Sequence, residues 1–270
     1  MFHALKISVF LLLLLFPVYA HASPPEEIMK KSQAAFLYQG RDFKARVMMR
    51  LTGKSGSERT RELTMLRKNY GEPGGVQRYF MYFFKPSDVK DMTFMVYKYP
   101  GRDDDRWLFV PALNMVRRVA AEDSRSSFAG SDFTYEDVSG RDIEDDLHEF
   151  MKIEENAKGP CADRECHKIK STPRSGGVDY AYRVSWIDGA THLPLKEEYY
   201  DKKEALVRVF TADEIREIKG FPTVTKRTMK NLQSGHSSEA AFTNVDYDIG
   251  LEDSIFSERH LKEPSKKRIE

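Results

Sequence analysis

Alternation of apolar and polar residues, repeated along most of the chain, limits most strongly what this sequence can fold into. In residues 43–51 (FKARVMMRL) every second side chain, from Phe43 to Leu51, is apolar. Because successive side chains of a strand point to opposite faces, this pattern predicts a strand buried on one side. The same period recurs in residues 60–68, 76–84, 91–99, 105–113, 114–119, 149–155, 166–173, 180–188, 193–201, 205–210, 221–231 and 241–248.

Turn sequences such as GKSGS and GEPGG separate these segments. Short strands joined by hairpin-length turns favour one large antiparallel sheet over βαβ units. Helices are expected in residues 23–36, 121–132, 141–150 and 253–261. A sheet of about eleven to thirteen twisted strands either closes into a barrel or leaves a mouth that helices cover. We expect a mainly β protein with a single domain over residues 23–270.

The first residues indicate export. Lys6 precedes the apolar run ISVFLLLLLF, and the small residues Ala20 and Ala22 satisfy the cleavage rule of a secretory signal peptide. The run is too short to span a bilayer by itself. We therefore expect residues 1–22 to be a signal peptide, cleaved after Ala22, and the mature protein to be periplasmic.

The charge balance argues against a nucleic-acid partner. The chain has 43 basic and 42 acidic residues, and loss of Lys6 with the signal peptide leaves 42 of each. A protein that binds DNA or RNA needs a basic face to neutralise phosphates. We expect no nucleic-acid binding, and we expect a monomer.

The two cysteines lie in CADREC, residues 161–166. In an exported chain such a pair predicts a Cys161–Cys166 disulfide. His167 beside them suggests a zinc site as the alternative, but a fourth ligand is not evident and the spacing matches no common zinc pattern. We expect no metal.

Residues 128–137 (FAGSDFTYED) could be either a site or a structural segment, because they hold three carboxylates beside serine and tyrosine. Acid–base catalysis needs carboxylates that converge in a pocket. On a strand Asp132 and Glu136 would face away from Asp137. The favoured interpretation is that the segment turns the chain, ties backbone amides and packs its aromatic side chains inward.

Sequence motifs for catalysis are missing. The chain contains no G-x-S-x-G, phosphate-binding loop, G-x-G-x-x-G or H-E-x-x-H pattern. We expect no enzyme activity and no cofactor. An esterase-type enzyme that uses residues 131–137 stays as the least favoured alternative.

Large apolar residues recur on one face of many expected strands. Wide sheets tend to enclose cavities, and methionine on several strands suits an adaptable lining. An apolar cavity in an exported protein suggests a hydrophobic ligand. The residues expected to line it are Met49, Met65, Met92, Phe94, Val96, Trp107, Phe109, Tyr182 and Trp186.

Four segments together resemble a known family. They are residues 105–119, 128–138, 193–210 and 221–231. They look like the outer-membrane lipoprotein-sorting proteins, the LolA-like periplasmic carriers. The resemblance implies an incomplete β-barrel that is lidded by helices and shields acyl chains in a hydrophobic cavity. It implies no catalytic residues. The length and the SDFTYED segment are similar to a branch often encoded beside export pumps of the resistance-nodulation-division type.

The expected function is therefore that of a periplasmic carrier that binds lipid or lipoprotein acyl chains for transport toward the outer membrane. Each buried methylene contributes about 0.8 kcal/mol, so hiding a dozen contributes on the order of 10 kcal/mol before ordering costs. The alternative is an accessory or adaptor subunit of a resistance-nodulation-division exporter that carries no cargo of its own.

Overall fold

The structure is a computed structural model that describes residues 23–153, 159–161 and 163–270. The expected signal peptide lies outside these residues, so its cleavage after Ala22 stays a prediction. The same holds for the last two residues of the strand expected at 149–155.

The described residues form one antiparallel sheet of 13 strands, in the order β6-β5-β4-β3-β2-β1-β13-β12-β11-β10-β9-β8-β7. Strands that follow each other in sequence are neighbours in the sheet, except that β6 and β7 lie at its opposite edges. The one pairing between strands far apart in sequence joins β1 and β13. The strands are β1 (Asp42–Thr52), β2 (Glu58–Tyr70), β3 (Val76–Lys85), β4 (Thr93–Lys98), β5 (Asp105–Val110), β6 (Met115–Val119), β7 (Asp146–Phe150), β8 (Cys166–Pro173), β9 (Tyr182–Asp188), β10 (Pro194–Tyr200), β11 (Leu206–Ile218), β12 (Phe221–Asn231) and β13 (His236–Tyr247).

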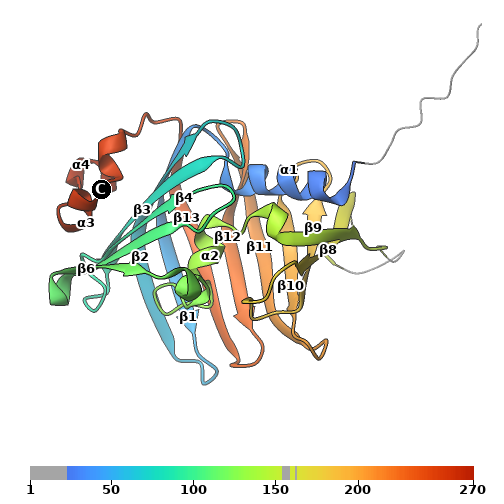
Figure 1. The fold of residues 1–270 in the computed structure, drawn as a ribbon. Coiled ribbons are helices and arrows are strands. Elements are labelled where there is room, and N and C mark those ends of the chain that lie inside the picture. The colour runs from blue at the N-terminus through green and yellow to red at the C-terminus, as the bar shows by residue number, and fades with distance from the viewer. Residues whose placement is uncertain (1–22, 154–158, 162) are drawn as a thin grey trace, which may run out of the picture.

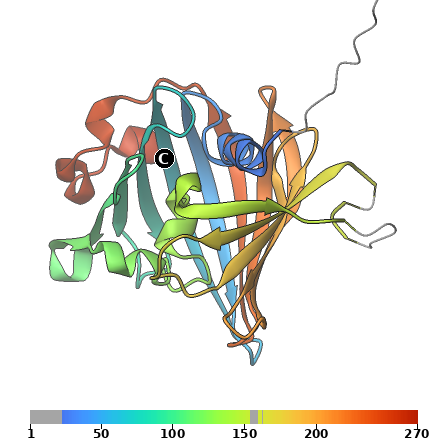
Figure 2. The same cartoon turned by 45° about the vertical axis from the view of Figure 1, so that its right-hand side comes forward.

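The sheet curls without closing, because β6 and β7 remain at its two edges. Figures 1 and 2 show the curl around two helices, α1 (Pro25–Leu37) and α2 (Tyr135–Ser139). The predicted large antiparallel sheet with a helix-covered mouth is thus confirmed. We call the side that faces α1 and α2 the concave face and the other side the convex face.

The sequence of α1 explains its position over the sheet. Pro25 occupies the first turn, where no backbone donor is needed, and Glu26 and Glu27 sit at the positive end of the helix dipole. Ile28 and Met29 are buried against Ile143, Ile169 and Ile187. This contact anchors α1 beside β8 and β9.

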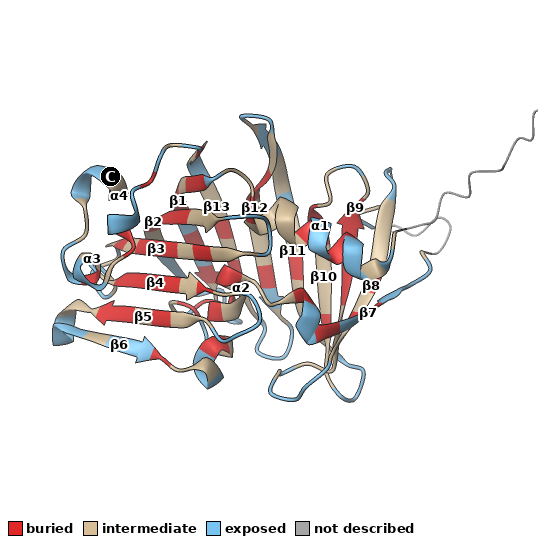
Figure 3. Cartoon of the chain, turned by 45° about the horizontal axis from the view of Figure 1, so that its top comes forward, coloured by how far each residue is buried: buried red, intermediate tan, exposed pale blue. Residues whose placement is uncertain are grey.

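Both faces of strands β2 to β5 are covered. The concave side holds the main core, and the C-terminal segment packs on the convex side with Leu251, Ile255, Phe256, Leu261 and Ile269. That segment contains short helical turns η4 (Asp253–Ile255), α3 (Glu258–Lys262) and α4 (Lys266–Ile269). Figure 3 shows buried bands running across these strands.

Two of the expected helices are wrong. Residues 141–150 form the turn η3 (Ile143–Asp145) followed by strand β7, and residues 121–132 hold only the turn η2 (Ala121–Arg125) and bends. In β7 the side chains of Asp146 and His148 are buried while that of Leu147 is exposed. This is a period of two, which fits a strand and not a helix.

A third short turn, η1 (Pro111–Leu113), links β5 to β6. Within the described part of the chain, no helix has the length and apolarity needed to cross a membrane.

Candidate functional site

The segment between the two edge strands crosses the concave face. Residues 120–145, which we call the strap, leave β6, pass through η2, α2 and η3, and enter β7. The green segment in Figure 2 follows this course inside the curl. The strap therefore bridges the opening that the sheet leaves between its edges.

Aromatic side chains fix the strap to the sheet. Phe128, Phe133 and Tyr135 are buried. The ring of Phe94 on β4 lies 5.5 Å from that of Phe128 and 5.0 Å from that of Tyr135. The strap thus fills the centre of the concave face with its own side chains.

Hydrogen bonds fix the turn that precedes α2. The Asp132 amide donates to the Ser238 hydroxyl (2.9 Å), which donates in turn to the Asp132 carboxylate (2.7 Å). His236 Nδ1 also lies 3.1 Å from that carboxylate. The Ser238 hydroxyl donates its proton to Asp132 and not to His236. This contact joins the strap to β13.

The start of α2 is a capping box. The Thr134 hydroxyl accepts from the Asp137 amide (3.0 Å), and the Asp137 carboxylate accepts from the Thr134 amide (2.7 Å). The same carboxylate accepts from Arg208 on β11 at 2.6 Å. Asp137 therefore orders the helix and ties it to the sheet.

The third carboxylate points elsewhere. Glu136 lies 3.7 Å from Arg125 and 3.7 Å from Arg141. Burial raises the pKa of Glu136 above its ordinary value, and the two arginines oppose the shift. Asp132, Glu136 and Asp137 thus have separate hydrogen-bond and ion-pair partners, although Glu136 and Asp137 both line one cavity.

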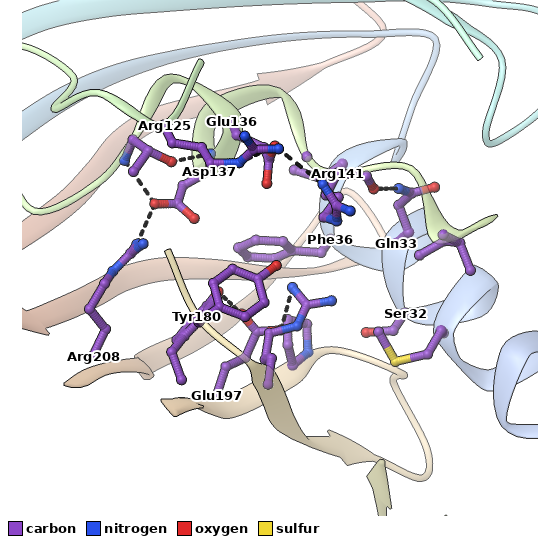
Figure 4. Close-up of a pocket in the computed structure, with 18 of the residues that line it drawn as sticks. Ser32, Gln33, Phe36, Arg125, Glu136, Asp137, Arg141, Tyr180, Glu197 and Arg208 are labelled. Carbon is purple, nitrogen blue, oxygen red and sulfur yellow. Dashed lines mark hydrogen bonds and ion pairs between the residues drawn. The ribbon is translucent and has the colours of Figure 1, made fainter. Parts of the chain in front are cut away.

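A charged cavity of about 110 Å³ lies between the strap, α1 and strands β9 to β11. Figure 4 shows Phe36 and Gln33 of α1 facing the arginines and carboxylates across it. Arg183 pairs with Glu197 at 3.4 Å on its floor. Burial raises the pKa of Tyr180, which also lines the cavity, above its ordinary value.

A larger hollow of about 620 Å³ opens beside the end of β4 and is lined mostly by charged side chains. Two ion pairs brace it. Arg106 donates to Asp104 (2.7 Å), whose carboxylate also accepts from the Ser139 hydroxyl (2.9 Å). Lys98 donates to Asp142 (2.9 Å) and to the Gly140 carbonyl (2.9 Å).

Gly140 also lies against α1. Its φ is +81°, and a Cβ there would lie 2.3 Å from Leu37 Cδ1. A larger side chain would strain the backbone and force the Leu37 side chain to move.

Two smaller cavities lie under α1 and the strap. One of about 50 Å³ touches α1, β2, β3, β12 and β13. The other, of about 30 Å³, is bounded by apolar side chains of β1 to β3, β13 and the strap, together with Arg227. Each has room for a few water molecules and not for an acyl chain.

Comparison with known proteins agrees with this architecture. A family model described as an uncharacterized protein matches residues 75–263, well over half of the chain. The chain belongs to this family. No curated protein matches the chain by sequence.

Solved structures show the same fold as this family member. A DUF1329 family protein from Desulfovibrio piger ATCC 29098 is 27% identical with a TM-score of 0.78, over 88% of this chain and 100% of that chain. A domain assigned to outer membrane lipoprotein sorting from Vibrio parahaemolyticus is 28% identical with a TM-score of 0.78, over 88% of this chain and 98% of that one.

A LolA superfamily protein from Nitrosomonas europaea shares the fold at 18% identity, with a TM-score of 0.67 over 88% of this chain and 100% of that chain. The LolA-like fold that the sequence resemblance implied is confirmed.

The structure divides the expected cavity-lining residues between the two faces. Met49, Met65, Phe94 and Val96 are buried in the core on the concave face, and Met92 packs against it. Met49 and Met65 line the 30 Å³ cavity. Contact of any of these residues with a ligand stays a prediction.

The other four were assigned to the wrong face. Trp107 and Phe109 pack with the C-terminal segment on the convex side. The reason is register: Phe94 pairs with Leu108, and Met95 pairs with Trp107, so Phe94 and Trp107 point to opposite faces. Arg106, the charged neighbour of Trp107, does not face solvent and is buried against Asp104.

Tyr182 and Trp186 also lie on the convex face. On β9, Ile187 belongs to the cluster under α1, so the side chain of Trp186 next to it points the other way. The Trp186 ring lies under the ammonium groups of Lys168 (5.1 Å) and Lys196 (5.0 Å). Tyr182 stacks on Tyr200 with ring centroids 4.8 Å apart.

The predicted disulfide is present, with Cys161 and Cys166 joined and their Cα atoms 5.7 Å apart. Among the described residues, no cluster of three or more metal-binding side chains occurs.

Sequence reasoning missed two arginines of the concave face, Arg67 and Arg227, which line the 50 Å³ cavity. Each interrupts an alternating segment at an inward position, and that interruption was the available signal.

Proposed function

We propose that this protein is a periplasmic carrier that binds acyl chains of a lipid or lipoprotein against the concave face of its sheet. Support comes from the similarity to a domain assigned to outer membrane lipoprotein sorting. The single observation that carries the proposal is the concave core itself, a wide apolar surface covered by the strap and not by a second sheet. The carrier role involves no reaction.

The proposed location follows from the sequence. The basic and apolar residues at the N-terminus and the A-x-A pattern at Ala20 and Ala22 are those of an exported protein. The disulfide between Cys161 and Cys166 suits an oxidising compartment.

Loading requires the strap to move. The cavities beneath it are too small for an acyl chain, so a chain must replace the strap's own apolar side chains, Phe128, Phe133 and Val138. The exchange is energetically balanced, because the ligand buries methylenes at about 0.8 kcal/mol each while the strap exposes comparable apolar area. A balanced exchange suits a carrier that must release its cargo.

One observation favours the adaptor role as a second candidate. The concave face is already filled by Phe128, Phe133 and Tyr135, as expected of a subunit without its own cargo. In that case the protein would join an envelope exporter of the resistance-nodulation-division type.

Native mass spectrometry of the mature protein, purified without detergent from its own periplasm, separates the two candidates. A carrier is expected to retain lipid on a fraction of the molecules, and the extra mass should disappear on mild activation. An empty monomer that gains no mass when incubated with lipid vesicles, or a stable complex with pump subunits, would favour the adaptor.

A further inference from the structure

The 50 Å³ cavity under α1 has an unusual charge composition. Its lining includes the side chains of Arg67 and Arg227, and none of its lining residues carries a carboxylate. Its other polar groups are neutral: the hydroxyls of Thr223 and Tyr247, which lie 2.9 Å apart, the Gln39 amide and the Tyr79 hydroxyl. Two cations thus line one small space whose walls supply no carboxylate.

Arg67 lies on β2 and is 5% exposed. One of its terminal nitrogens donates to the Gln39 carbonyl, and its Nε is buried with no hydrogen-bond partner. Its guanidinium lies 5.1 Å from the centre of the Phe43 ring. Burial lowers the pKa of Arg67, and only tyrosines and the more weakly coupled Asp42 oppose the shift.

Arg227 lies on β12 and is more isolated. Its Nε is also buried without a partner, and among the described residues no carboxylate is within ion-pair distance of it. Its guanidinium is surrounded by the rings of Phe242 (4.7 Å), Phe36 (5.3 Å) and Phe133 (5.5 Å). Burial lowers the pKa of Arg227 to about 10, and the Asp137 carboxylate, which lies beyond ion-pair distance, opposes the shift.

Other arginines of the concave side have carboxylate partners, so the two differ from their neighbours. These pairs are Arg106 with Asp104, Arg141 with Asp146, Arg183 with Glu197 and Arg208 with Asp137. A buried charge without a partner destabilises a fold. Two such charges at one cavity indicate a partner that is not part of the chain.

The position of the cavity identifies the class of partner. Met65, Val138, Arg227 and Phe242 line both this cavity and the apolar 30 Å³ cavity beneath the strap. An oxyanion between the arginines would therefore continue directly into the apolar space. Guanidinium groups bind carboxylate and phosphate through two parallel hydrogen bonds.

We propose that Arg67 and Arg227 bind the oxyanion, carboxylate or phosphate, of an anionic acyl lipid whose chain occupies the space now filled by Phe128 and Phe133. This inference rests on the proposed carrier function and adds the charge of the ligand. The proposal places the lipid headgroup next to α1, because Phe36 of α1 lines the cavity and its ring contacts the Arg227 guanidinium.

Calorimetric titration tests the assignment. The mature protein is titrated with dodecanoate and, separately, with dodecanol, which has the same chain without the charge. We expect dodecanoate to bind at least about tenfold more tightly, which corresponds to about 1.4 kcal/mol. Arg227→Gln is expected to remove this preference while binding of dodecanol persists. Arg50→Gln, on the convex face and paired with Glu239, is the matched control and should keep the preference.

The outcomes separate the two proposals. Binding of neither amphiphile by the wild type would overturn the carrier function. Equal binding of both, or a preference that survives in Arg227→Gln and Arg67→Gln, would overturn only the oxyanion site. Inorganic phosphate that binds at micromolar concentration and loses binding in Arg227→Gln would show a site for a free anion, which also overturns the lipid assignment. If Arg67→Gln does not fold, Arg227→Gln alone decides.

Discussion

Besides its apolar core, the concave side holds several buried ion pairs. Asp104 and Arg106 are both almost fully buried, with side chains 5% and 6% exposed. Their geometry is good, and Ser139 satisfies a further lone pair of the carboxylate. Such a pair contributes little when intact, but loss of one partner leaves the other charged and buried.

Asp104→Ala is therefore expected to lower the free energy of unfolding by about 3–5 kcal/mol, because it leaves Arg106 without a counterion. Asp103→Ala is the matched control, since Asp103 is exposed next to it and should cost less than about 0.5 kcal/mol. Chemical denaturation of both variants measures the difference. Equal stability of the two variants would show that the buried pair does not support the fold.

At the scale of elements, β7 is an edge strand held to the strap by a buried histidine. His148 Nδ1 lies 2.9 Å from the Ser171 hydroxyl, and its Nε2 lies 2.9 Å from the Ile143 carbonyl. The carbonyl can only accept, so the neutral ring donates from Nε2. Burial lowers the pKa of His148 below its ordinary value. The hydrogen bond to the Ile143 carbonyl, Asp146 and Glu26 oppose the shift in pKa, and Arg183 acts with burial.

The lowered pKa of His148 decides the direction of the pH effect on stability. Well above about pH 6.5 the imidazole is neutral in the folded and in the unfolded chain, and as the pH falls below about 6.5 the unfolded chain takes up the proton first. Stability is therefore lost as the pH falls through this range. His148→Gln should lose less stability than the wild type between about pH 7.5 and pH 5.5. The control variant His260→Gln, on α3, should lose as much stability over this pH range as the wild type does. Parallel losses in wild type and His148→Gln would contradict the assignment.

The sequence predicted where the strands lie better than it predicted which side of each strand faces the concave core. Clear alternation, as in residues 43–51, gave strands whose buried side the structure confirms. Strand β5 was ambiguous because Trp107 and Leu108 are both large and apolar, and the structure covers both of its faces. A strand buried on both sides loses its alternation, so the pattern cannot select the inward face.

The strap could not be predicted as a unit for another reason. Its fixing residues, such as Phe128 and Asp132, contact strands far away in sequence, and its only α-helix has five residues. Arg67 and Arg227 each fall at an inward position of an alternating segment, so the local pattern marks them as unusual. Only the long-range contacts of the fold place both at one cavity.

At the scale of the whole molecule, the fold is an open curl whose two edges, β6 and β7, are joined by the strap. We propose that the strap controls access to the concave core and must leave the concave face before an acyl ligand can bind. The Ser238 hydroxyl contacts both the amide (2.9 Å) and the carboxylate (2.7 Å) of Asp132, so these two side chains face each other between the strap and β13 and are the positions chosen for a cysteine pair.

The most direct measurement is dodecanoate binding by an Asp132→Cys/Ser238→Cys double variant before and after reduction. The wild type receives the same reductant, as a control for reduction of the Cys161–Cys166 bond. The account predicts that the oxidised variant, folded but with its strap locked to β13, binds no ligand. It predicts that reduction restores binding, while the wild type binds in both conditions. Undiminished binding by the locked protein would contradict the central claim.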